Sequence, residues 1–159
     1  MNATAARSVG WRPDWGRYAL LWVRMAFGSH SLISGLNHFL PLFSIDGGGD
    51  PALSPIGPLM GELMATGLYD GVKLVETAVG ICLLANRFVP LAALVELPIS
   101  VVIAWLCLFV DESPNIVFSG LREISFNLFI LACYAGYFRP VVAWKADVRP
   151  VWSGRSAGR

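Results

Sequence analysis

Four long apolar stretches, separated by polar loops, dominate the pattern of hydrophobic and polar positions in this chain. They cover residues 18–43, 68–85, 88–110 and 121–138. The hydrocarbon core of a bilayer is about 30 Å thick, and a helix needs about 20 mostly apolar residues to cross it. Because each stretch is near that length, the pattern predicts an all-α integral membrane protein. We expect a four-helix bundle that forms a single domain over residues 1–159.

The loop between the first two stretches carries a further helical signal. Leu59, Met60, Leu63 and Met64 recur at helical spacing after a segment rich in glycine and proline. An apolar face on so short a segment is typical of a helix that lies on a membrane surface. We therefore expect a short interfacial helix in the first outer loop. The tails, residues 1–17 and 145–159, are expected to be polar and exposed.

Basic residues outside the apolar stretches are confined to one side of the predicted bundle. They precede the first stretch, separate the second from the third, and follow the fourth: Arg7, Arg12, Arg17, Arg87, Arg139, Lys145, Arg149, Arg155 and Arg159. The other two loops contain acidic residues and no Lys or Arg. Since short loops rich in Lys and Arg stay in the cytoplasm, both termini are predicted to be cytoplasmic. The same rule favours a bacterial inner (plasma) membrane.

The composition supports a lipid-facing chain. Hydrophobic residues make up 55% of the sequence and charged residues 14%. A soluble domain usually has about 25% charged residues. The basic residues act as topology signals beside the membrane, so we expect the bilayer as a partner and no nucleic acid.

Several ionisable residues lie inside the predicted spans, where each costs roughly 2.5–3.5 kcal/mol and usually faces the bundle interior. Arg24 in the first span and Glu96 in the third lie at similar depths, so we predict that they form a buried ion pair. Lys73 and Glu76 are three positions apart on the second span and can pair with each other.

The remaining polar positions predict a polar interior in the outer half of the bundle. We expect five residues to form it: His38, Lys73, Glu76, Glu123 and Asn127. Three interpretations remain open. These groups could hold the helices together, line a cavity for a quinone or a lipid headgroup, or form a proton or ion pathway.

Recognised catalytic and metal-binding patterns are absent from the sequence. His30 and His38 share one helix, about 80° and about 12 Å apart, so they cannot hold the same metal ion. The zinc-protease, phosphate-loop, serine-hydrolase and dinucleotide fingerprints are missing as well. We therefore expect no metal, name no catalytic residue, and leave open whether the chain has any catalytic activity of its own.

Residues 63–104 resemble the DoxX-like family of small four-helix bacterial membrane proteins. Glu76, Gly80 and Arg87 match a glutamate, a small residue and a basic turn in that family's pattern. Arg24 and the small residues that follow it resemble the first helix, although Asn37-His38 replaces the basic residue usual there. The resemblance implies the four-helix fold. It also implies a link with membrane redox systems, including small subunits associated with quinone-dependent sulfur oxidation.

Together these features predict an accessory subunit of a membrane redox complex, with a quinone or lipid in the polar cavity. Its expected partners are other membrane or redox proteins, or further copies of itself. The alternatives are a self-contained oxidoreductase subunit, a small oligomeric transporter or channel, and a structural membrane adaptor.

Overall fold

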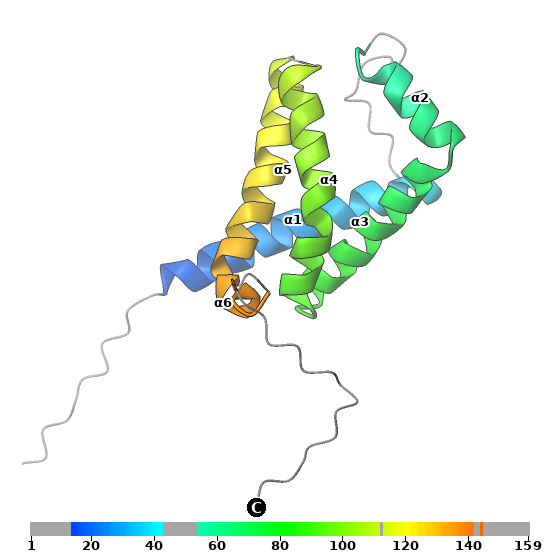
Figure 1. The fold of residues 1–159 in the computed structure, drawn as a ribbon. Helices are drawn as coiled ribbons and strands as arrows, with labels where there is room; N and C mark the ends of the chain where they lie inside the picture. The colour runs from blue at the N-terminus through cyan, green and yellow to red at the C-terminus, as the bar shows by residue number, and fades with distance from the viewer. Residues whose placement is uncertain (1–13, 43–53, 112, 142–143, 145–159) are drawn as a thin grey trace, which may run out of the picture.

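The computed structural model describes residues 14–42, 54–111, 113–141 and 144. The elements in these ranges are all helices (Figure 1): α1 (Trp15–Phe39), α2 (Gly57–Ala65), α3 (Leu68–Leu84), α4 (Val89–Phe109), α5 (Pro114–Cys133) and α6 (Ala135–Phe138). The predicted all-α class is confirmed. The predicted tails lie outside the described residues, except that 14–17 cap and open α1.

Helices α1 and α5 begin earlier in the sequence than the apolar stretches predict, because capping residues start them. The Asp14 side chain accepts a hydrogen bond from the Arg17 backbone N–H at 3.3 Å, so α1 begins before residue 18. At the start of α5, Ser113 precedes Pro114, whose fixed φ suits the first helical position. The predicted fourth span, 121–138, is therefore too short at its start. It is also interrupted at Tyr134, where α5 ends and the short α6 follows.

The four long helices form two antiparallel pairs, α1 with α3 and α4 with α5. The pairs touch each other through α3 and α4 and through α1 and α5. In Figure 1 they cross at a wide angle and diverge toward α2. We call the end that holds α6 and the α3–α4 turn the turn end, and the opposite end the α2 end. The predicted helix in the first outer loop is confirmed as α2, while its position at a membrane surface remains a prediction.

Two glycines allow α1 and α3 to approach closely. A Cβ atom at Gly35 would lie 2.7 Å from the Lys73 carbonyl oxygen, and one at Gly80 would lie 2.5 Å from the Leu32 nitrogen. Small residues at helix interfaces permit this backbone contact. The contact fixes Lys73 and its neighbours on α3 directly against the buried face of α1.

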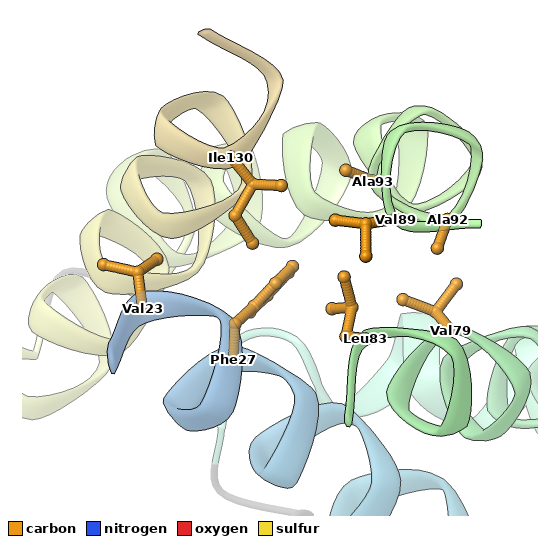
Figure 2. Close-up of a cluster of buried hydrophobic side chains, with 8 residues drawn as sticks. All are labelled: Val23, Phe27, Val79, Leu83, Val89, Ala92, Ala93 and Ile130. Atoms are coloured by element: carbon orange, nitrogen blue, oxygen red, sulfur yellow. The ribbon is translucent and has the colours of Figure 1, made fainter. Parts of the chain in front are cut away.

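Most buried side chains are sorted into two layers, and Ala104 and Cys107 of α4 lie beyond both, against Gly120 of α5. An apolar layer near the turn end consists of Val23, Phe27, Val79, Leu83, Val89, Ala92, Ala93 and Ile130 (Figure 2). A polar layer consists of Ser31, Lys73, Glu76, Glu96, Ser100, Glu123 and Asn127. On each long helix the polar layer follows the apolar one toward the α2 end, as the neighbours in sequence show: Phe27 and Ser31, Val79 and Glu76, Ala93 and Glu96, Ile130 and Asn127.

Helices α4 and α5 are each long and apolar enough to cross a membrane. The mean hydropathy of their most apolar windows is 2.3 and 1.6. Among the described residues, α1 and α3 do not meet the same criterion, and α3 has only 17 residues. Of the four predicted spans, two thus form helices that are long and apolar enough to cross a membrane.

Candidate functional site

Lys73 and Glu76 of α3 form a buried ion pair at the centre of the polar layer. The Lys73 Nζ lies 2.7 Å from Glu76 Oε2, which confirms the predicted pairing along one helix face. Lys73 Nζ also donates to Ser34 Oγ of α1 at 2.8 Å and lies 5.1 Å from the centre of the Tyr69 ring. The Lys73 charge is therefore neutralised by Glu76 of the same helix, and the ammonium group also reaches Ser34 of α1.

A hydrogen-bonded chain joins α4 to α5 on the other side of the polar layer. The Asn127 amide donates to Ser100 Oγ at 3.0 Å, and Ser100 in turn donates to Glu123 Oε1 at 3.5 Å. The other carboxylate oxygen of Glu123 lies 3.6 Å from His30 Nε2. Arg122 Nη2 approaches the same histidine nitrogen at 3.4 Å. Glu123 of α5 is thus linked to two other helices, α4 through Ser100 and α1 through His30.

Glu96 of α4 lies in the same layer but has no hydrogen-bond partner in the part of the chain that the structure describes. Its residue is 1% exposed, and neither carboxylate oxygen has a hydrogen-bond partner among the described residues. The predicted Arg24–Glu96 pair is wrong, because Arg24 Nη1 instead donates to Asn86 Oδ1 in the α3–α4 turn. The reason is depth: Arg24 follows Val23 of the apolar layer near the turn end, whereas Glu96 belongs to the polar layer nearer the α2 end.

His38 lies nearer the α2 end than the buried polar layer. Its Nε2 lies 2.7 Å from Asp70 Oδ1 of α3. Its ring packs edge-on against Tyr69, with the ring centres 5.0 Å apart. Of the five residues predicted for the polar interior, Lys73, Glu76, Glu123 and Asn127 belong to the polar layer, and His38 is separate from them.

Two adjoining cavities lie between these groups. The deep cavity, of about 70 Å³, is enclosed by all four long helices, through His30, Ser31, Ser34, Lys73, Glu76, Glu96, Ile103, Ser119 and Glu123. The mouth cavity, of about 290 Å³, lies toward α2 and is lined by His30, Ile33, Ser34, Asn37, His38, Met64, Tyr69 and Lys73. Because His30, Ser34 and Lys73 line both, the two cavities are neighbours, separated only by these side chains.

The lining is rich in hydrogen-bonding groups but does not form a metal site. Within the described part of the chain, no three His, Cys, Asp or Glu side chains converge closely enough to hold a metal ion. The deep cavity instead brings together separate carboxylates, hydroxyls and one ammonium group. Such an arrangement can orient a ligand through hydrogen bonds and single charges.

Sequence reasoning missed the role of α4 in this site. Glu96 and Ser100 are four positions apart and therefore share one face of α4. That spacing was a usable signal, but Glu96 was assigned to Arg24 by depth alone. Ser34 and Ser119 gave no comparable signal, because single serines are common in helices that pack closely.

At the α2 end, Asp111 ties the segment before α2 to the α4–α5 loop. Its carboxylate accepts hydrogen bonds from Ser113 Oγ at 2.8 Å and from Ser54 Oγ at 3.0 Å. These bonds favour the ionised form, so first Ser113 and then Ser54 lower the pKa of Asp111 below its usual value.

No family model, no curated protein and no solved structure matches this chain. The resemblance of residues 63–104 to the DoxX-like family therefore remains a prediction from sequence.

Proposed function

We propose that this protein is a helical membrane protein that binds a small amphiphilic molecule, a quinone or a lipid headgroup, in the mouth cavity. The observation that carries the proposal is the mixed lining of this cavity beside a buried lysine. We further propose that it acts as an accessory subunit of a membrane redox complex.

Membrane insertion is supported by the exposed surface of α4 and α5. Only 28% and 22% of their most apolar windows are buried within the protein, whereas the core helix of a soluble protein is mostly buried. The exposed side chains of α4 include Val102, Trp105 and Phe109, each more than half exposed. Since apolar surface in water costs about 25 cal/mol per Å², a continuous face of this kind favours a lipid environment.

The distribution of charge supports a topology with both termini in the cytoplasm. Arg17, Arg87 and Arg139 belong to the start of α1, the α3–α4 turn and the end of α6, which lie in the lower part of Figure 1. The acidic Asp70 and Asp111 belong to the opposite end, near α2 and the α4–α5 loop. By the positive-inside rule the turn end faces the cytoplasm of a bacterial cell, and the mouth cavity lies in the outer half of the membrane.

The lining of the mouth cavity suits a flat ring that carries hydrogen-bond acceptors. Tyr69, Ile33 and Met64 offer aromatic and aliphatic surface against which such a ring can pack. Lys73 Nζ and Ser34 Oγ, which bond each other at 2.8 Å, offer donors at the boundary with the deep cavity. A quinone carbonyl or a headgroup phosphate oxygen accepts from donors of this kind.

The accessory role rests on the resemblance to the DoxX-like family in residues 63–104. In this proposal a partner protein carries the electron-transfer centre, and this chain holds the quinone close to it. The apolar outer face of α4 and α5 provides the surface for such a partner within the bilayer.

The test uses the full chain, extracted gently from its own membrane and purified in mild detergent. Bound molecules are extracted with solvent and identified by mass spectrometry, and co-purifying proteins are identified by native mass spectrometry. Tyr69→Ala should lower the bound quinone or lipid severalfold. Tyr137→Ala, an exposed tyrosine on α6 outside both cavities, serves as the matched control. Equal ligand content in both variants, or none in the wild type, would contradict the proposal.

A further inference from the structure

Of the described carboxyl groups around the deep cavity, only Glu96 has no opposing charge within ion-pair distance. The charged and titratable groups around the cavity come from all four long helices: His30, Lys73, Glu76, Glu96, Arg122 and Glu123. Lys73 neutralises Glu76 at 2.7 Å. Arg122 and His30 together lie beside Glu123. Glu96 remains without an opposing charge.

Protonation alone does not satisfy Glu96. A protonated carboxyl group needs an acceptor for its O–H, and an ionised one needs donors for both oxygens. Neither oxygen has a partner among the described residues, although the side chain is almost completely buried. Because buried polar groups are normally hydrogen-bonded, the missing partner belongs to a molecule that enters the cavity.

The two Glu96 oxygens favour a molecule that donates hydrogen bonds, since carboxylate oxygens act only as acceptors. Ser31 donates its O–H to the Phe27 carbonyl at 3.1 Å, and Ser34 Oγ accepts from Lys73. Both hydroxyl groups keep a lone pair that can accept a further hydrogen bond from the same molecule. A ligand with several N–H groups and one positive charge complements both the oxygens and the charge.

The volume limits the ligand to a few heavy atoms. A water molecule occupies roughly 30 Å³ of liquid, so the cavity of about 70 Å³ holds about two waters or one small cation. A tightly coordinated metal ion is disfavoured, since no three ligating side chains converge within the described ranges. An ammonium group, by contrast, uses single hydrogen bonds to separated acceptors.

We propose that the deep cavity is a site for one small ammonium-type cation, with Glu96 of α4 as its anchoring residue. This site is distinct from the amphiphile site proposed for the mouth cavity. The cation lies between Glu96 and the hydroxyl groups of α1, where it donates hydrogen bonds to the Glu96 oxygens and opposes their negative charge.

The test is isothermal titration of the purified full chain with methylammonium chloride at constant ionic strength. The wild type should bind one equivalent. Tetramethylammonium chloride should not bind, because it has the same charge but no N–H. Glu96→Gln should weaken methylammonium binding by at least about tenfold, since a charge-assisted hydrogen bond is lost. Glu62→Gln, at an exposed position on α2, is the matched control and should bind as the wild type does.

A second variant covers the case in which Glu96→Gln does not fold, as judged by elution volume and helix content. Ile103→Phe places a larger ring in the cavity lining and should remove binding while all carboxylates remain. Equal binding of methylammonium and tetramethylammonium, no binding to the wild type, or wild-type affinity in both variants would overturn the proposal. Quinone and lipid content, measured on the same preparations, reports on the mouth cavity separately, because Glu96→Gln should leave it unchanged.

Discussion

Gly80 of α3 lies against the backbone of Leu32 of α1, so that a Cβ atom at position 80 would come within 2.5 Å of the Leu32 nitrogen. The contact involves backbone atoms, which cannot move aside as a flexible side chain can. It lies one turn from Glu76 and therefore sets the distance between α1 and the ion pair of α3.

Gly80→Ala should destabilise the protein by about 1–3 kcal/mol, because the added methyl group forces α1 and α3 apart. Gly71→Ala on the same helix is the control, since a Cβ there meets nothing within 4 Å. The control should be neutral or more stable by about 0.5–1 kcal/mol, as alanine favours a helix over glycine. Thermal unfolding of both variants in detergent measures the difference, and equal stability would contradict the close contact.

Glu76→Gln should lower the free energy of unfolding by about 3–5 kcal/mol, because it leaves the Lys73 ammonium group buried without its carboxylate. The double variant Lys73→Met with Glu76→Leu should recover most of this loss, since it removes both charges and keeps the volume. Unfolding by denaturant measures the free energy of unfolding of both the single and the double variant. If the single variant is as stable as the wild type, the pair does not contribute to folding.

Ser100→Ala should destabilise more than Asn127→Leu. Ser100 both accepts from Asn127 and donates to Glu123, so its loss leaves two buried groups without a partner. Each such group costs about 1–3 kcal/mol. Asn127→Leu removes an amide whose oxygen already lacks a partner within the described structure, and it fills the space with an apolar side chain. Parallel thermal unfolding curves give the order, and the reverse order would rule out Ser100 as the central link.

Asp111→Asn should reduce stability at neutral pH but not in acid. The hydrogen bonds from Ser113 and Ser54 lower the pKa of Asp111 in the folded protein. Their contribution is therefore present above the unfolded pKa of about 3.9 and is lost as the pH falls through the lower folded value. The melting temperatures of wild type and variant should differ at pH 6 and converge below about pH 4. A difference in melting temperature that persists in acid would show that the ionised Asp111 carboxylate is not its cause.

The sequence predicted the helical class and most of the buried polar residues for a clear physical reason. Apolar stretches near the length of a span mark helices, and ionisable residues within them are too costly to face lipid. Lys73 and Glu76 could be paired because both lie on one helix, where spacing fixes the geometry.

The errors arose wherever the answer depended on how helices pack together. Position along the helices predicted Arg24 level with Glu96, but Arg24 lies near the turn end beside Asn86, and Glu96 lies in the polar layer. His38, which was predicted for the polar interior, lines the mouth cavity together with Lys73, and its ring nitrogen contacts Asp70 at the α2 end. Hydropathy alone starts the fourth span at residue 121, whereas Ser113 followed by Pro114, a helix-start signal in the sequence, begins α5.

The order of the two layers has a consequence for permeability. A solute that enters past Tyr69 and Lys73 meets Phe27, Leu83 and Ile130, which are at most 1% exposed and pack against one another. These side chains act as an insulating plug on the cytoplasmic side of the proposed topology. In that topology the apolar layer closes the polar interior toward the cytoplasm, so passage across the membrane would require the two helix pairs to separate at these side chains.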